Sequence, residues 1–440
     1  MNTPAARPVQ GPLGDPSHDR DEGLLRVCVA TPLFPPDYSG AAVRFQRYAP
    51  GLRKRGVAMH VVAAEVGAWR RKGGYPAWSD KSTKRTAPTV DIQVHRVAMP
   101  KARHPGTKAT QRRNRTFERA VVGHCREAST RPDVLIWLYS PLVRGVPNLL
   151  RIRREGVPMM RAETMFDSGS LPLWKRWLQP VYRPLLYRLM DCLVVGTGAM
   201  HDSLRDLGVR TPIEVIPHGV DLTRFRPARD PEERTALRSR LELADDSESV
   251  LFVGPLSARK GVLELASAWD RVAEARPKAH LILVGPEQRG SEARDSFAAQ
   301  VRERFARGHG ADRVRFVGPV GDVENYLRAA DLFVFPSQRE GMPNAVCEAF
   351  ASGLPTILTP FLGLSDELGR RGREYVLVER TPTQIGDGIL RLLGDNERRR
   401  SLGAAARRWA EDRLDVEGSL DRLASLCKQV ASGRSGVSIS

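Results

Sequence analysis

Two glutamates, Glu340 and Glu348, are eight positions apart, and their setting points to the binding of a ligand rich in hydroxyl groups. Glu340 stands in a polar loop after the apolar run 332–335, which is typical of a buried parallel strand. Glu348 stands in a helical pattern over 345–352 that Gly353 ends. A carboxylate accepts hydrogen bonds through two oxygens, so this pair could hold one ligand at two points. The alternative is that both glutamates are ordinary solvated surface charges.

A second candidate site is the turn from Gly254 to Gly261, which follows the apolar run 250–253 and precedes a helical pattern. Arg259 and Lys260 put two positive charges at the expected start of that helix, where backbone N–H groups are free. Fixed positive charge beside free N–H groups can hold a diphosphate and stabilise it as a leaving group. The alternative is a solvated basic turn, and the nearby glutamate pair makes diphosphate binding the favoured interpretation.

Two further positions carry weaker signals. Gly40 lies where the first expected strand meets the first expected helix, and a glycine there lets the backbone approach a ligand closely. His218 lies in the stretch 217–221, which together with Phe225 and Pro227 predicts a tight turn that packs the linker. This turn is expected to be mainly structural, with the His218 side chain as a candidate to face the cleft.

An alternation of strands and helices that occurs twice must position these residues. Residues 23–217 predict one doubly wound domain and residues 218–412 a second, with a hinge near 217–230. Two Rossmann-like halves would leave a cleft faced by the carboxyl ends of strands from both sides. The expected strands are 24–30, 57–64, 92–97, 133–138, 158–162, 192–195 and 213–216, then 250–253, 280–284, 314–317, 332–335, 356–358 and 375–378; the expected helices include 41–55, 116–130 and the helical region 383–428.

The bulk composition is compatible with this division and adds a strong charge. A chain of 440 residues exceeds what one hydrophobic core usually serves. The formal net charge of +18 predicts attraction to anions such as a nucleotide, a phospholipid surface, an acidic glycan or nucleic acid. The alternative is that the charge only keeps the surface soluble.

The cysteines and the termini indicate a reduced, cytosolic protein. The five cysteines are scattered without CxxC or metal-ligand spacing, so we expect reduced core thiols. No apolar run approaches the roughly 18–20 residues that would span a bilayer. Residues 1–22 lack an apolar core and are expected to be a disordered leader, not a signal peptide, and residues 432–440 a loose tail.

Residues 174–188 interleave aromatic, leucine and basic side chains around Trp174 and Trp177. Such a pattern suits an amphipathic element at a membrane interface. The alternative, which we favour slightly, is an ordinary surface helix with a proline kink. Membrane contact at the inner face of the cell membrane is therefore one expectation for the localisation of this otherwise cytoplasmic protein.

Several motifs together resemble the family 4 retaining glycosyltransferases. The segment from Glu340 to Glu348 matches the E-x7-E signature of that family, and residues 216–221 match its interdomain IPNGVD element. Residues 253–261 match its phosphate loop, and residues 314–318 and 330–337 also fit. The resemblance covers roughly residues 25–425 and is strong over 213–405. It implies a GT-B fold of two Rossmann-like domains, with a C-terminal helix, 413–431, that crosses back to the first domain.

The resemblance also implies an activity and a set of roles. It implies transfer of a sugar from a nucleotide-diphosphate donor, with retention of the anomeric configuration by front-face attack. Glu340 would contact the donor sugar at the reacting centre, Glu348 would bind the ribose, and Arg259 and Lys260 would hold the diphosphate. The other donor-binding positions implied by the resemblance are Gly40, Gly254, Val320, Gly341, Met342, Pro343 and Asn344.

The chain departs from the family pattern in its phosphate loop and on the acceptor side. Pro255 stands where the family often has arginine, a loss for which Arg259 could compensate. Where a cleft histidine often follows a strand of the first domain, this chain has the stretch 161–167, so Glu163 and Asp167 join His218 as acceptor-side candidates. The fold normally relies on protein cations in place of a metal, so we expect no metal and no cofactor beyond the nucleotide-diphosphate sugar as co-substrate.

Three hypotheses remain for the function. The leading one is a hexosyltransferase acting on a glycan or lipid-linked acceptor in cell-envelope or exopolysaccharide biosynthesis. A second is a non-catalytic basic scaffold for membrane or nucleic acid, although no nucleic-acid motif is visible and we expect no nucleic-acid partner. The third is a dinucleotide-dependent oxidoreductase, which is disfavoured because the string 196–201 lacks the third glycine and the acidic ribose partner.

Overall fold

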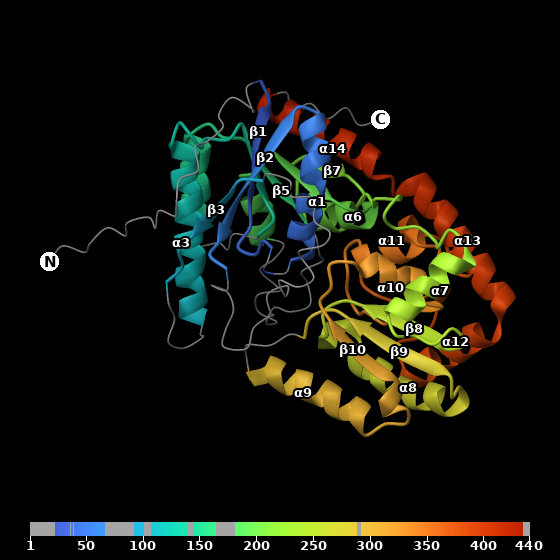
Figure 1. Cartoon of the computed structure of the whole chain (residues 1–440). Coiled ribbons are helices and arrows are strands. Elements are labelled where there is room, and N and C mark those ends of the chain that lie inside the picture. The colour runs from blue at the N-terminus through green and yellow to red at the C-terminus, as the bar shows by residue number, and fades with distance from the viewer. Residues whose placement is uncertain are drawn as a thin grey trace.

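The computed structural model describes residues 23–35, 37, 39–66, 92–100, 107–139, 145–163, 181–287 and 292–433. These residues form two α/β domains that face each other, joined by two neighbouring crossings of the chain (Figure 1). The expectations for residues 1–22 and 174–180, for the end of the chain after residue 433 and for Asp167 lie outside the described residues.

The first domain is built on a seven-stranded sheet in which all neighbouring strands are parallel. The order β3-β2-β1-β4-β5-β6-β7 reverses between β1 and β4, as in doubly wound folds. Its central strands are buried on both faces, which explains their nearly continuous apolar sequences, whereas β3 at the edge is only half-buried. The strands are β1 Leu25–Ala30, β2 Val57–Ala64, β3 Val94–Val97, β4 Val134–Trp137, β5 Met159–Ala162, β6 Cys192–Val195 and β7 Ile213–Val215.

The second domain repeats this plan with six parallel strands in the order β10-β9-β8-β11-β12-β13. Its order reverses between β8 and β11, so the loops after these two strands leave the sheet side by side. In an open α/β sheet this switch point is where ligands bind. The strands are β8 Glu248–Val253, β9 Ala279–Val284, β10 Val314–Gly318, β11 Leu332–Phe335, β12 Thr356–Leu358 and β13 Val376–Leu377.

Helices cover both faces of each sheet (Figure 1). In the first domain α1 packs on one face, and α3, α4 and α6 contribute to the other. In the second domain α7, α10, α11 and α13 contribute to one core layer, and α8, α9 and α12 to the opposite one. The helices are α1 Gly40–Lys54, α3 Thr107–Arg126, α4 Val146–Arg154, α6 Gly198–Asp206, α7 Pro231–Arg240, α8 Val262–Ala275, α9 Glu292–Ala306, α10 Val323–Ala329, α11 Asn344–Ala351, α12 Pro382–Gly394, α13 Asn396–Arg413 and α14 Val416–Ala431.

The last helix, α14, leaves the second domain and packs on α1 of the first. Leu420, Leu423 and Cys427 join the core layer beneath α1. The contact with α1 is close, because a Cβ at Gly51 would lie 2.3 Å from Leu420 Cδ1. Arg55, directly after α1, forms ion pairs with Glu417 and Asp421 at the exposed edge of this contact. The expected doubly wound pair with a C-terminal helix returning to the first domain is therefore confirmed.

The two chain crossings between the domains run side by side. The amide of Val220 donates to the carbonyl of Leu414 at 2.8 Å, and Ser419 Oγ donates to the carbonyl of Pro217 at 3.1 Å. A Cβ at Gly219 would lie only 2.6 Å from Val416 Cα, so a residue larger than glycine would not fit between the two crossings. The 217–221 turn therefore packs the linker, as predicted.

Two helical regions differ from the sequence-based expectation. The helix predicted over 116–130 spans Thr107–Arg126 instead, so the predicted boundaries are wrong. Its first turns are polar and carry no apolar period, yet alanine, glutamine and arginine favour a helix there. Residues 231–240, expected only as a charged stretch, form α7, which Asp230 caps by accepting from the amide of Glu233. Among the described residues, no helix has the length and apolar character that a bilayer crossing requires.

Candidate functional site

The two loops at the switch point of the second domain carry the residues singled out as diphosphate and sugar ligands. The loop after β8 ends in Lys260 and Gly261, directly before α8. The loop after β11 carries Glu340 and ends at α11. The loops touch through the amide of Gln338, which donates to the carbonyl of Arg259 at 2.9 Å.

Glu340 is the centre of a compact charged cluster. Its Oε1 accepts from Lys260 Nζ at 2.7 Å and from Arg259 Nη1 at 2.5 Å. Ser337 Oγ donates to the same oxygen at 2.5 Å. Both Glu340 and Lys260 are buried, with 6% and 7% of their surface exposed, and burial lowers the pKa of Lys260 against the opposing effect of Glu340. The alternative of solvated surface charges is therefore wrong for these two residues.

Lys260 is also fixed from its other side. Its Nζ lies 4.4 Å from the centroid of the Phe335 ring, within the range of a cation–π contact. Gly254 packs nearby, because a Cβ there would lie 3.6 Å from Lys260 Cε. The ammonium group is thus held in one place between the ends of β8 and β11.

Glu348 reaches the first domain from α11. One of its carboxylate oxygens accepts from Arg47 Nη1 of α1 at 2.8 Å. Arg47 is also stacked over the ring of Phe225, 5.6 Å from its centroid. The second glutamate of the pair therefore faces the interdomain space, on the same β11–α11 unit as Glu340, and an arginine of the opposite domain neutralises it.

His218 connects the linker to the same loop. Its Nδ1 lies 2.9 Å from Asn344 Oδ1, and its backbone amide lies 3.1 Å from Met342 Sδ. Burial, and secondly the charge of Arg44, hold the pKa of His218 well below its usual range. The imidazole is therefore neutral at pH 7 and serves as a hydrogen-bonding group between the domains.

The buried, neutral His218 predicts an acid-labile contribution to stability. In the unfolded chain an imidazole titrates near 6.5. Because the folded pKa is lower, this contribution is complete above that pH and is lost as the pH falls below it. One such group makes the unfolding free energy fall by about 1.4 kcal/mol per pH unit. Urea unfolding between about pH 6.5 and pH 5 should therefore be less steeply pH-dependent in His218→Gln than in the parent. The matched control is His201→Gln on α6, and an unchanged slope for His218→Gln would contradict the assignment.

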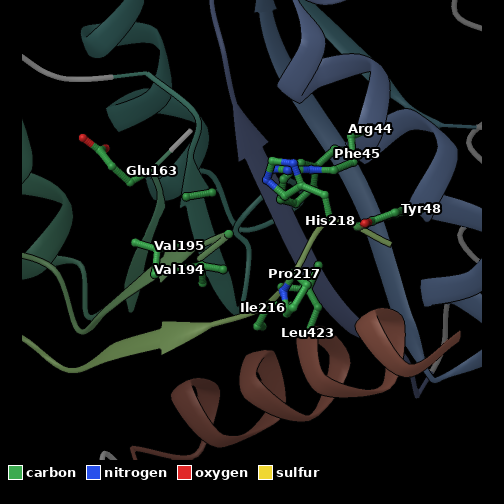
Figure 2. A pocket seen from close by; sticks show the side chains of 12 residues that line it. Arg44, Phe45, Tyr48, Glu163, Val194, Val195, Ile216, Pro217, His218 and Leu423 are labelled. Carbon is green, nitrogen blue, oxygen red and sulfur yellow. The ribbon is translucent and has the colours of Figure 1, made fainter. Parts of the chain in front are cut away.

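A hollow lies beside His218, on the side of the first domain (Figure 2). Arg44, Phe45 and Tyr48 of α1 line it together with residues of β5, β6 and α14. Glu163 also lines it, but its side chain extends away from His218 in Figure 2. Its carboxylate accepts from Arg161, from Arg183 at 3.4 Å and from Tyr187 Oη at 3.0 Å. Glu163 is thus tied into a buried ion-pair network.

The structure brings most of the predicted donor residues onto one segment. Gly341, Met342 and Pro343 are buried between Glu340 and α11, and Asn344 begins that helix. Gly40 begins α1, four residues before Arg44. Val320 lies in the loop between β10 and α10 and packs against the core of the second domain. Asp167 lies outside the described residues.

Sequence reasoning missed three residues that line the hollow or link the two domains. Arg44 and Arg47 lie on one face of α1, and Arg44 lines the hollow. Arg44 and Arg47 are three residues apart, shortly after Gly40, and this spacing was a readable signal of a basic helix face. Glu367 is the third: its carboxylate accepts from the amide of Gly198 at 2.5 Å, at the amino end of α6. No local pattern pointed to that contact.

Two family models match the chain, one on each half. Residues 39–219 match the model described as "Glycosyl transferase 4-like domain". Residues 247–395 match the model described as "Glycosyl transferases group 1". The two matches fall on the two domains and include α1, the loop after β8 and the loop after β11.

Curated relatives agree with these matches. The D-inositol 3-phosphate glycosyltransferase of Jonesia denitrificans is 32% identical over 227 residues, which cover 50% of this chain and 52% of the relative. A lipopolysaccharide core biosynthesis mannosyltransferase of Rhizobium meliloti is 29% identical over 231 residues, covering 52% and 61% of the two chains. The aligned part of this chain spans about half to three fifths of the length of these relatives.

Solved structures extend the likeness of fold to nearly the whole chain. Sucrose-phosphate synthase from Thermosynechococcus elongatus superposes with a TM-score of 0.73 at 19% identity, covering 93% of this chain and all of that one. Anabaena HepE in complex with UDP and glucose gives a TM-score of 0.68 at 17% identity, covering 92% and 99%. With family models matching both domains and glycosyltransferase relatives matching about half of the chain, this protein belongs to the GT4-type glycosyltransferases and has their GT-B fold.

Proposed function

We propose that the chain is a retaining glycosyltransferase that moves a sugar from a nucleotide-diphosphate donor to a glycan or lipid-linked acceptor. The observation that carries the proposal is the cluster of Arg259, Lys260 and Glu340 at the β8/β11 switch point. Two cations there share one carboxylate oxygen, so the cluster keeps a net positive charge. A donor diphosphate would meet that charge where the free amides of α8 begin.

The roles follow from the geometry of this cluster. Lys260 and Arg259 bind the diphosphate and stabilise the charge that develops on it when the glycosidic bond breaks. Glu340 holds both cations in place and presents its carboxylate to the donor sugar. In this proposal the two protein cations stabilise the diphosphate charge, as a metal ion does in other transferases, so the reaction needs no added metal.

Glu348 is the proposed ribose ligand, and Arg47 is its partner before the donor arrives. A carboxylate already aimed at the interdomain space can accept from the two ribose hydroxyls. The ion pair with Arg47 is half-exposed on the arginine side, so exchanging it for the ribose costs little. Arg47 is then free to turn towards the phosphates.

The names of related proteins support the proposed substrate class. One relative is a D-inositol 3-phosphate glycosyltransferase and another is a GDP-mannose-dependent mannosyltransferase acting on a phosphatidylinositol mannoside. A third is a lipopolysaccharide core mannosyltransferase, and HepE was solved with UDP-glucose. These names support a nucleotide-sugar donor and an envelope glycan or lipid-linked acceptor, in cell-envelope or exopolysaccharide biosynthesis.

A donor screen tests the proposal. The purified chain should be heated with a panel of UDP-, GDP- and ADP-sugars in the presence of EDTA, and the melting temperature and sugar release followed. We expect one nucleotide class to raise the melting temperature and to be hydrolysed slowly with retention of configuration. Failure of every nucleotide sugar, together with salt-sensitive binding to DNA or anionic vesicles, would favour the scaffold alternative instead.

Replacing Glu348 with alanine is expected to weaken donor binding more than turnover. A hydrogen bond to a charged group contributes roughly 1.5–3 kcal/mol, so the KM for the donor should rise about 10- to 100-fold. Initial rates over a range of donor concentrations measure this. The matched control is Glu411→Ala on α13, another helical glutamate held by one arginine, at 2.6 Å from Arg407. If the KM of the Glu348→Ala enzyme for the donor is unchanged, Glu348 does not bind the ribose.

Contact with an anionic membrane is a further part of the proposed setting. The helical stretch 181–187 exposes Val181 and Leu185, 61% and 55% accessible, on one face. Its other face is anchored by Tyr187 and Arg183 through Glu163. Co-sedimentation with anionic vesicles should fall steeply with salt and fall further in a Val181→Ser, Leu185→Ser variant. The same substitutions at the exposed Val66 and Leu362 are the control; equal losses would exclude a specific face.

A further inference from the structure

Strand register in the first domain brings a cysteine and a histidine together on the face away from α1. Cys28 of β1 is the direct register partner of His60 of β2. Their neighbours Val27, Val29 and Val61 point to the opposite face, into the core layer beneath α1. Because side chains alternate along a strand, Cys28 and His60 face the layer that α3 covers.

Two more imidazoles pack against this pair. His124, in the last turn of α3, has its ring centroid 5.0 Å from that of His60. His95 of β3 has its ring centroid 4.6 Å from that of His124 and 6.0 Å from that of His60. The ligand atoms of Cys28, His60 and His124 all lie within 4.8 Å of one another.

The two deeper histidines lack the hydrogen bonds that buried imidazoles normally make. His60 Nε2 and His124 Nε2 are buried without a partner, and each residue is only 8% exposed. A buried polar atom without a partner costs about 1–3 kcal/mol, and here two occur in contact. Burial lowers the pKa of His60 to about 3 and that of His124 to about 4, so both imidazoles carry a free lone pair at pH 7.

We propose that Cys28, His60 and His124 form a structural zinc site, with His95 as the fourth ligand. One thiolate and three imidazoles are a donor set that Zn²⁺ accepts, and the two unpartnered Nε2 atoms would gain a bond. Ordinary core packing is the competing explanation, but an apolar core would not collect three imidazoles and leave two nitrogens unpaired.

For Cys28, His60 and His124 the geometry needs only a small adjustment. Tetrahedral zinc with bonds of about 2.0–2.3 Å separates its ligand atoms by roughly 3.4–3.8 Å. The ligand atoms of Cys28, His60 and His124 must therefore approach one another by up to about 1 Å, and His95, which lies outside this group of three, must move further. Rotation of the imidazoles about their side-chain bonds supplies these movements. Burial raises the pKa of the Cys28 thiol, so the metal must displace its proton on binding.

The position of the site indicates what it would do. It joins β1, β2, β3 and α3, whereas α1 with Arg44 and Arg47 covers the other face of the same sheet (Figure 1). The metal is therefore distinct from the sugar-transfer site and takes no part in the reaction. It would link the edge of the sheet, where β3 is short and only half-buried, to α3.

Metal titration of the complete chain tests the proposal without any substitution. Protein stripped with a chelator under reducing conditions should bind one equivalent of Zn²⁺ and should melt at a higher temperature when loaded. One equivalent of Co²⁺ should give visible bands of tetrahedral intensity and a thiolate-to-cobalt charge-transfer band in the near ultraviolet. Failure to bind either ion stoichiometrically, or a Co²⁺ spectrum without the thiolate band, overturns the proposal.

Matched variants identify the ligands. Cys28→Ser should abolish the charge-transfer band, while Cys192→Ser, another buried free thiol of the same sheet, should leave it unchanged. His60→Asn should weaken Zn²⁺ binding at least 100-fold, since losing even an outer partner costs about 10–100-fold. His280→Asn on β9 is its control. Binding that survives both Cys28→Ser and His60→Asn would place the metal elsewhere and overturn the assignment.

Discussion

Replacing Lys260 with methionine is expected to lower kcat by about 10²- to 10³-fold, the typical cost of removing one preorganised group that stabilises developing charge. Methionine keeps the apolar stem over Phe335 and removes only the ammonium group. Glu340 keeps Arg259 and Ser337 as partners, so the fold should survive. Sugar transfer or donor hydrolysis at saturating donor measures the effect, and circular dichroism confirms the fold.

The control for this substitution is Lys278→Met. Lys278 makes an exposed ion pair with Asp246 at 2.8 Å, outside the switch point, and its loss should leave kcat unchanged. If Lys260→Met retained more than about a tenth of the parent kcat, the diphosphate would have to be held by other groups. Arg259→Met would then be the next variant to measure, since its side chain is the other cation on Glu340.

Replacing Gly261 with alanine is expected to abolish transfer and to destabilise the second domain. Gly261 joins the basic turn to α8 with φ of 68°, and its Cβ would lie 2.0 Å from the carbonyl oxygen of Pro336. A left-handed backbone alone costs an alanine about 1–2 kcal/mol. The overlap with Pro336 adds to this and can be relieved only by separating the loops after β8 and β11. Because those loops carry Lys260 and Glu340, both stability and activity should fall together.

Urea unfolding and transfer assays follow both consequences. Gly418→Ala in α14 is the matched control, because a Cβ there meets nothing within 4 Å. That variant should be neutral or slightly more stable, as alanine is in most helices. A Gly261→Ala enzyme with parental stability and activity would show that the two loops do not need their close approach.

The strands of this protein were predictable because of where they lie. Parallel strands covered on both faces must be apolar throughout, so runs such as 250–253 and 332–335 stood out and proved to be β8 and β11. Helices at the surface carry weaker patterns. The start of α3 and the whole of α7 were missed, because their first turns are polar and carry no apolar period; α7 begins instead at its Asp230 cap.

The site was predictable where it lies within one domain, and was missed where two domains meet. Lys260 and Glu340 belong to adjacent loops of a single sheet, so strand–loop–helix reasoning brought them together. The partner of Glu348 is Arg47, 301 positions earlier in the chain, and no local pattern connects the two. The Cys28–His60 pair was equally hidden, because it depends on the register of two strands and not on a ligand spacing.

The side-by-side crossings at Val220 and Leu414 have a consequence for how such a chain can be rebuilt. The second domain enters and leaves the first at almost the same point, so topologically it is a cassette inserted before the final helix. Two cuts at adjacent positions would release it as one continuous piece, and a short bridge would reseal the remainder. The second domain of a relative could thus replace this one without disturbing the first domain, because the junction consists of only two neighbouring crossings of the chain.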